Sequence, residues 1–337
     1  MKKNSIILLS TILLLSFYNG KNNHNSSPAK AHSKKDTNNF RPGALWYDEK
    51  GEVINAHGGG ILLVGKTWYW FGEKRDTHRS EGVNVYSSKD LYHWKYEGIA
   101  LSQSNDPQSD VTVGCVMERP KVIYNAKTKK YVMWFHLELK DQGYKAARAA
   151  VAISDKITGP YTFLKSFRPN DNMSRDMTLF VDDNNKAYQI YSSRENYDMR
   201  IVELSDDYTS PTTKDKMIFS LHREAPAIFK YNKEYYLITS GCTGWAPNKA
   251  DIHVADSLFG DWTLLGNPLH GEGADSTYGG QSTYILPVPG KKTSFIFIAD
   301  KWNPKDLKDS RYIWLPIQFK NSQPYIEWTD SWNLNDH

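Results

Sequence analysis

The sequence predicts an all-β fold, and more narrowly a five-bladed β-propeller. From residue 53 onward, short runs of β-branched and aromatic residues alternate with polar turns, and no long amphipathic helical pattern interrupts them. Paired runs also recur at nearly equal intervals, as in repeats whose blades bury their faces only against their neighbours. These two observations favour a propeller that occupies the chain from residue 41 to residue 337.

Five predicted hairpins carry this repeat along the chain. Their strand pairs are Gly60–Val64 with Thr67–Phe71, Pro120–Tyr124 with Tyr131–Phe135, Met177–Val181 with Ala187–Tyr191, Ala227–Phe229 with Tyr235–Ile238, and Ser282–Val288 with Ser294–Ala299. Polar turns such as Asp-Asp-Asn-Asn-Lys at residues 182–186 join the two strands of a pair. Each pair is therefore expected to form the inner part of one blade.

The residues at the hairpin entrances are the candidates for a functional site. They are Gly58, Glu118, Asp176, Glu224 and Gln281, and successive entrances are 60, 58, 48 and 57 residues apart. In a propeller the innermost strands line the central axis, so residues at their starts converge on one end of the channel. We therefore expect three carboxyl groups and one amide to meet in a single pocket.

The amino terminus predicts export from the cell. Within residues 1–20, Lys2 and Lys3 precede an apolar run from Ile6 to Phe17 and a polar end, as in a secretory signal peptide. That run is too short to span a bilayer. Residues 21–40 are rich in Asn, Lys, Ser and His and predict a disordered linker. We expect a periplasmic or secreted protein with no membrane span.

Composition limits the classes of partner and cofactor that we expect the protein to bind. The net charge of +4 is small and evenly spread, which argues against nucleic acid and polyanionic substrates. The 11 Trp and 21 Tyr residues fit a sugar-binding cleft, although propeller cores also use them. His57 beside three glycines is expected to support a loop, and no metal or cofactor is predicted. A disulfide between Cys115 and Cys242 is possible in an exported protein but is not favoured.

Glu224 is the first candidate for catalysis. Burial behind Ala225 and Pro226 would raise its pKa toward the range that a general acid needs, whereas the structural alternative is a strand cap paired with Arg223. Asp176 would tune this acid by charge repulsion. Two carboxyl groups across a glycosidic bond can hydrolyse it, and a separation of about 6.5–9.5 Å leaves room for water and gives inversion.

Two motifs resemble those of glycoside hydrolase family 43. Arg-Glu-Ala-Pro-Ala-Ile-Phe at residues 223–229 resembles the acid motif of that family, and Asp-Met-Thr-Leu-Phe at residues 176–180 resembles its pKa-modulator motif. The resemblance covers the chain from residue 41 and implies a five-bladed propeller that removes arabinose, xylose or galactose with inversion. One departure is that Gly58 occupies the place of the family's usual base Asp.

Residues 56–60 (Ala-His-Gly-Gly-Gly) and 69–73 (Tyr-Trp-Phe-Gly-Glu) instead resemble the exo-β-1,3-galactanase subgroup. This likeness implies Glu224 as the acid, Gln281 in the base position and Glu118 as its charged partner. It also implies sugar contacts from Glu73, Arg119, Tyr144, Asp176, Asn196 and Thr243. Trp245 is expected to form a sugar platform, because its loop follows the second strand of the acid's hairpin.

The combined expectation is a monomeric, inverting exo-hydrolase that releases galactose from the non-reducing end of β-1,3-galactan, the backbone of arabinogalactan. A neutral amide has no useful basicity, so we expect Gln281 to position the water while Glu118 carries the charge. Two alternatives stay open. One is an α-L-arabinofuranosidase or β-xylosidase of the same fold, and the other is a sugar-binding propeller without catalysis.

Overall fold

The computed structural model describes residues 38–76, 80–291 and 294–336. The predicted signal peptide at residues 1–20 and residues 21–37 of the predicted linker lie outside these ranges. Among the described residues, no helix has the length and apolar character needed to cross a membrane.

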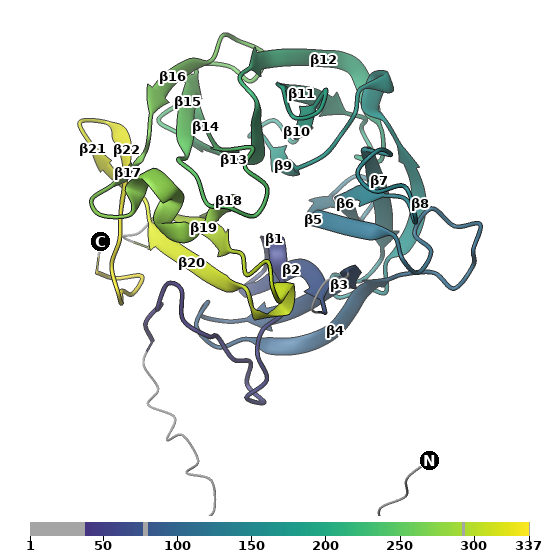
Figure 1. Ribbon diagram of the computed structural model, residues 1–337, viewed down its shortest axis with the longest axis horizontal. Coiled ribbons are helices and arrows are strands. Elements are labelled where there is room, and N and C mark those ends of the chain that lie inside the picture. Colours follow the sequence, from purple (N-terminus) through teal and green to yellow (C-terminus); the bar gives the residue numbers. More distant parts are fainter. Residues whose placement is uncertain (1–37, 77–79, 292–293, 337) are drawn as a thin grey trace, which may run out of the picture. The chain divides into compact units, whose positions relative to one another are not determined.

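The described chain is all-β, as predicted, and its sheets surround a common centre (Figure 1). The four-stranded sheets consist of β1 (His57–Val64), β2 (Thr67–Arg75), β3 (Ser80–Ser88) and β4 (Lys95–Ser102); β5 (Val116–Asn125), β6 (Lys130–Glu138), β7 (Arg148–Ser154) and β8 (Thr162–Phe167); β9 (Met177–Val181), β10 (Ala187–Ser193), β11 (Asp198–Leu204) and β12 (Pro211–Ser220); and β13 (Arg223–Tyr231), β14 (Glu234–Gly241), β15 (Asp251–Ala255) and β16 (Thr263–Gly266). The three-stranded sheets consist of β18 (Gln281–Pro287), β19 (Phe295–Lys301) and β20 (Arg311–Pro316), and of β17 (Leu269–His270), β22 (Gln323–Glu327) and β21 (Gln318–Lys320).

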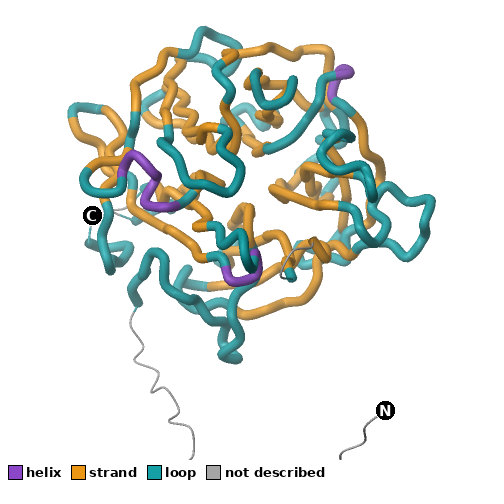
Figure 2. The backbone as a smooth tube through the Cα atoms, viewed as in Figure 1, coloured by secondary structure: helices purple, strands orange, loops and turns teal. Residues whose placement is uncertain are grey.

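Helical structure in the described residues is limited to short 3-10 turns, drawn in purple in Figure 2. They are η1 (Pro169–Asp171), η2 (Ala274–Gly279) and η3 (Leu307–Asp309). All five predicted hairpins are present as antiparallel pairs, namely β1 with β2, β5 with β6, β9 with β10, β13 with β14, and β18 with β19. Alternation of apolar residues with turn residues was therefore sufficient to predict the inner part of the fold.

The predicted count of five blades is wrong, because the described residues form six sheets. The sheet that the prediction missed joins the two-residue strand β17 to β22 in parallel, and β22 to β21 in a hairpin. Its strands come from two segments far apart in the sequence, residues 269–270 and 318–327. A repeat counted by inner hairpins could not detect it. The inner strands β1, β5, β9, β13 and β18 contact one another in turn around the centre.

Three of the five inner strands share a local distortion at the ends that meet near the centre. The pairing register of β1, β5 and β13 shifts between His57 and Gly60, between Glu118 and Lys121, and between Glu224 and Ala227. At these bulges Gly58, Arg119 and Ala225 have positive φ angles of 58°, 55° and 53°. Bulges re-aim side chains at the ends of strands. Repeated bulges therefore turn the entrance residues of separate sheets toward one pocket.

The aromatic residues contribute mostly to the core. Trp70, Trp94, Trp314 and Trp332 are buried in one cluster, and Phe40 packs on Trp332 with ring centroids 4.5 Å apart. A backbone hydrogen bond of 2.8 Å from Phe40 N to Trp332 O joins the beginning and the end of the described chain. The Trp content therefore reflects ring closure as much as any sugar cleft.

Candidate active site

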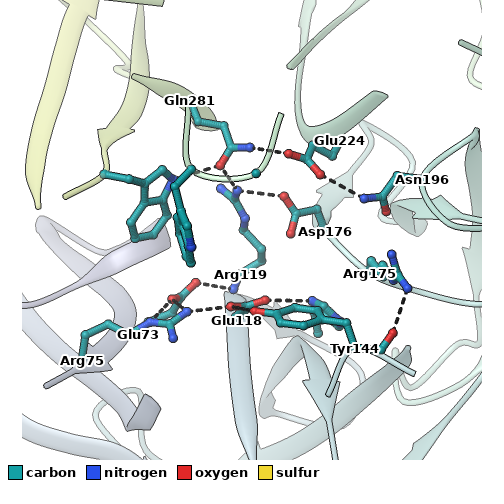
Figure 3. Close-up of a pocket in the computed structure, with 14 residues that line it drawn as sticks. Glu73, Arg75, Glu118, Arg119, Tyr144, Arg175, Asp176, Asn196, Glu224 and Gln281 are labelled. Atoms are coloured by element: carbon teal, nitrogen blue, oxygen red, sulfur yellow. Dashed lines mark hydrogen bonds and ion pairs between the residues drawn. The ribbon is translucent and has the colours of Figure 1, made fainter. Parts of the chain in front are cut away.

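Four of the five hairpin entrances, Glu118, Asp176, Glu224 and Gln281, converge on one pocket of about 240 Å³ (Figure 3). It is lined by Glu73, Arg75, Glu118, Arg119, His136, Tyr144, Arg175, Asp176, Asn196, Glu224, Gly244, Trp245, Gln281 and Trp302. Nine of the ten residues predicted for the site are in this set. Thr243 is not among them, because its hydroxyl donates to Ala246 O at 2.6 Å and accepts from Asn248 Nδ2 at 2.7 Å within its own loop.

Glu224 is held by an amide at each carboxyl oxygen. Its Oε1 accepts from Gln281 Nε2 and its Oε2 from Asn196 Nδ2, both at 2.9 Å. Burial and the nearby charge of Asp176 raise the pKa of Glu224 to about 7, although the positive charge of Arg119 opposes this. Glu224 can therefore hold a proton near neutral pH, as a general acid must.

Glu224 does not form the ion pair with Arg223 that was the structural alternative to a catalytic role. The Arg223 guanidinium instead lies 3.2 Å from Asp251 Oδ2 and donates to Thr239 O at 2.7 Å. The two adjacent side chains thus point to different partners, as expected for neighbours on a β-strand. Glu224 is left without a paired cation of its own, which is consistent with its raised pKa.

Glu118 has the opposite electrostatic character. Burial alone would raise its pKa, but hydrogen bonding and charge from His136 and Arg75 outweigh burial and hold the pKa well below its usual range. Its Oε1 accepts from Arg75 Nη2 at 2.8 Å and from the Tyr144 hydroxyl at 2.7 Å, and its Oε2 lies 3.2 Å from His136 Nδ1. Glu118 is therefore a buried, ionised carboxylate.

Glu73 forms the other side of the same network. Its Oε2 accepts from Arg75 Nε at 2.7 Å and its Oε1 from the Arg119 backbone N–H at 2.8 Å. Burial raises the pKa of Glu73, while the charge of Arg75 opposes this shift and the charge of Glu118 adds to it. Arg75 thus bridges two buried carboxyl groups, and this pairing offsets the cost of burying it.

Arg119 is the central cation of the pocket. Its Nη2 lies 2.8 Å from Asp176 Oδ2 and donates to Gln281 Oε1 at 2.5 Å (Figure 3). Its Nη1 donates to Thr283 Oγ1 at 2.9 Å. The guanidinium extends from β5 to residues at the starts of β9 and β18. Its planar set of donors therefore fixes side chains from three sheets relative to one another.

A cluster of potential metal ligands lies in the pocket, where donor atoms of Glu118, His136 and Asp176 come within 4.8 Å of one another. The carboxylates of this cluster already contact the guanidinium groups of Arg75 and Arg119. A metal ion would have to displace these cations or share the carboxylates with them, which like-charge repulsion disfavours. The donor set is accounted for as an ion-pair network.

Five lining residues were not predicted from the sequence, namely Arg75, His136, Arg175, Gly244 and Trp302. Two of them had a usable signal. Arg75 follows Glu73 by two residues in one strand, so both side chains share a face, and His136 pairs directly with Glu118 across the β5–β6 hairpin. The others follow from loop geometry, which no strand pattern specifies.

Gly58 stands where the usual base Asp was expected and has no room for a side chain. A Cβ atom on Gly58 would lie 2.1 Å from Glu73 Oε1, and its φ of +58° is strained for residues with side chains. The carboxyl group of Glu73 therefore occupies the space into which a side chain at position 58 would extend.

Replacing Gly58 with Asp is expected to lower the free energy of unfolding by about 3–5 kcal/mol, because it adds a clash and an unpaired buried charge. Urea denaturation measures this directly. Gly58→Ala is the matched control, since it introduces the same clash and backbone strain without the charge, and it should cost less. A Gly58→Asp variant as stable as the wild type would refute this account of the position.

Sequence and structure comparisons agree with one another. The sequence profile of glycosyl hydrolases family 43 matches residues 57–297. A family 43 β-1,3-galactosidase with bound galactodeoxynojirimycin is 51% identical over 87% of this chain and 100% of its own, with a TM-score of 0.85. No curated protein sequence gave a match.

Two exo-β-1,3-galactanases are also similar in structure. The enzyme from Phanerochaete chrysosporium with galactose is 38% identical over 88% of this chain and 69% of its own, with a TM-score of 0.82. The enzyme from Clostridium thermocellum is 37% identical over 89% of this chain and 67% of its own, with a TM-score of 0.81. Since the family profile spans most of the chain and every hairpin entrance, the protein belongs to glycosyl hydrolases family 43.

Proposed function

We propose that the protein is an exo-acting hydrolase that releases galactose from the non-reducing end of β-1,3-galactan. The observation that carries this proposal is a small, charged pocket around a carboxyl group with a pKa of about 7. Its volume of about 240 Å³ is below the range of about 300–1,000 Å³ typical for drug-sized ligands and suits one sugar ring. Similarity to a β-1,3-galactosidase and to exo-β-1,3-galactanases supports galactose as that sugar.

In the proposed reaction Glu224 donates its proton to the leaving glycosidic oxygen while a water attacks the anomeric carbon from the opposite face. Asp176 keeps the pKa of Glu224 high by charge repulsion, as predicted for the modulator position. Glu118 supplies the negative charge toward which the water releases its proton. Among the described residues its Oε2 has one hydrogen-bonding or ion-pair partner, His136 Nδ1 at 3.2 Å, so a carboxylate lone pair remains for a water. Direct displacement of this kind inverts the configuration.

Turnover is expected to fall as the pH rises through about 7. Glu224 acts only when protonated, and burial beside Asp176 raises its pKa to about 7, so the active fraction is highest below that pH and decreases above it. Glu118, whose pKa is lowered, stays ionised through the mildly acidic range. A profile of kcat from pH 4 to pH 9 tests this, and a profile that stays flat up to pH 9 would contradict the assignment of Glu224.

The proposed function is tested by digesting debranched β-1,3-galactan and following the first minutes by proton NMR. Galactose that appears first as the α-anomer would support both exo action and inversion. If no galactose forms, aryl arabinofuranosides and xylosides are the next substrates, since those sugars are the alternative on this fold. Galactose binding without any product would instead identify a binding propeller.

We also propose that the protein is exported and acts as a monomer. Lys2, Lys3 and the apolar run at residues 6–17 support a signal sequence that directs it to the periplasm or the medium. Amino-terminal sequencing of the native protein should start after about residue 20, and size-exclusion chromatography should give the monomer mass of 38.7 kDa less the signal peptide.

A further inference from the structure

All hydrogen-bonding positions of the Gln281 amide are occupied by protein groups. Its Oε1 accepts from Arg119 Nη2 at 2.5 Å and from Trp302 Nε1 at 2.9 Å, and its Nε2 donates to Glu224 Oε1 at 2.9 Å (Figure 3). The same Nε2 donates to Ser240 Oγ at 3.1 Å. A primary amide has two acceptor lone pairs and two N–H donors. None of the four is therefore left to hold or deprotonate a water.

The partners of Gln281 also determine which end of the amide faces which group. A guanidinium and an indole N–H can donate but cannot accept, so Arg119 and Trp302 require the oxygen of Gln281 on their side. Turning the amide over would place its NH2 group against two donors and its oxygen against the Glu224 carboxyl. The observed orientation is the one that satisfies all four contacts.

The same contacts bear on whether Gln281 can act as a base. An amide becomes a usable base only as its imidic acid tautomer, in which the proton moves from nitrogen to oxygen. That oxygen would then carry a hydrogen directed at Arg119 and Trp302, which have no lone pair to receive it. Both groups stabilise the ordinary amide instead. The contacts of the site therefore disfavour the imidic acid tautomer that base catalysis by Gln281 would need.

We propose that Gln281 orients the acid Glu224 through its N–H group and is not the base, and that Trp302 is a positioning residue that holds Gln281 in this role. The proposal rests on the proposed hydrolase function and deepens it. With Asn196 bound to its other oxygen, the Glu224 carboxyl is fixed at both ends, as directed proton donation requires. It also replaces the expectation that Gln281 positions the water.

Trp302 suits this positioning role because its ring is packed in place. It follows β19 directly, its ring centroid lies 5.3 Å from that of Trp245 in a T-shaped arrangement, and the Arg119 guanidinium carbon lies 5.9 Å from its ring. Phenylalanine at this position would keep most of the ring packing and lose only the indole N–H. Trp302→Phe therefore isolates the hydrogen bond to Gln281.

The deciding experiment is Gln281→Glu, assayed for kcat, KM and the pH profile on β-1,3-galactobiose. A base at this position would work as well or better as a carboxylate. An orienting donor would be lost, and the added negative charge beside Glu224 would raise the pKa of the acid further. We expect kcat to fall at least 100-fold and the basic limb of the profile to move to higher pH. Activity equal to or above that of the wild type would overturn the proposal.

Trp302→Phe is the second variant, and it keeps the proposal testable if Gln281→Glu does not fold. We expect a 10- to 100-fold lower kcat, a KM within about threefold of wild type, and a basic limb shifted upward because Glu224 loses a well-oriented donor. Trp245→Phe is the matched control, because it alters the adjacent ring without touching Gln281, and it should change KM and leave the limb in place. An unshifted limb in Trp302→Phe would refute its role. Failure of the proposed hydrolase function can be told apart from failure of this proposal, because in that case the wild type itself would release no galactose.

Discussion

Replacing Glu224 with Gln is expected to lower kcat on β-1,3-galactobiose by about 10²–10⁴-fold, which is the usual contribution of general acid–base catalysis. Glutamine matches the size of the side chain but cannot donate a proton of suitable acidity. The amides of Gln281 and Asn196 would still find one acceptor oxygen at position 224. Galactose binding should therefore stay measurable by calorimetry while turnover is lost.

A substrate with a better leaving group separates a lost proton donor from general damage to the site. β-Galactosyl fluoride needs little protonation of its leaving group, so the deficit of Glu224→Gln should shrink strongly on it. Glu234→Gln is the matched control, because Glu234 is exposed on the neighbouring strand β14 and outside the pocket. An equal loss on galactobiose and the fluoride would show that Glu224 is not the acid.

The parts of the fold that the sequence predicted are those fixed by local pattern. Alternating apolar residues and polar turns define each inner hairpin within a short segment, and all five were found. The missed sheet depends on pairing of Leu269 with Ile326 and of His270 with Glu327. A two-residue strand has too few residues to show any period, so no periodicity search could place it.

The candidate site shows a similar division. Glu118, Asp176, Glu224 and Gln281 could be found because each stands at the entrance of a predicted hairpin, and these entrances converge in a propeller. The position of Arg119 at the centre of the pocket could not be predicted from the strand pattern. It depends on a positive φ of 55° at a bulge that the sequence does not mark with glycine. The pKa values of the two acids also differ for reasons outside their own strands: burial and the charge of Asp176 raise the pKa of Glu224, whereas His136 and Arg75 outweigh burial and lower that of Glu118.

Replacing Glu118 with Gln is expected to lower kcat by at least about 10²-fold, because the pocket loses the ionised carboxylate that is proposed to receive the water's proton. It should also lower the free energy of unfolding by about 1.5–3 kcal/mol, the value of a hydrogen bond to a charged group. Arg75 keeps its contact with Glu73, which limits the loss. Steady-state kinetics and urea denaturation give the two quantities separately.

Glu138→Gln is the matched control for the stability effect. Glu138 is fully buried and contacts the other ring nitrogen of His136 at 2.8 Å, yet it does not line the pocket. Removing its charge should destabilise the protein by a similar amount and reduce kcat far less. If the two variants lost the same activity, the effect of Glu118→Gln would be structural and its proposed role in the reaction would be wrong.

The pH dependence of the stability loss gives an independent check on Glu118. Its lowered pKa stabilises the fold above its unfolded value of 4.5, and this contribution disappears as the pH falls through the lower folded value. His136 is opposed by burial, but Glu118 and Glu138 raise its pKa to about 9, so its contribution is complete below 6.5 and disappears as the pH rises through about 9. The cost of Glu118→Gln should therefore be greatest between about pH 4.5 and 6.5. A cost that does not vary with pH would mean that the charge of Glu118 is not what holds this network together.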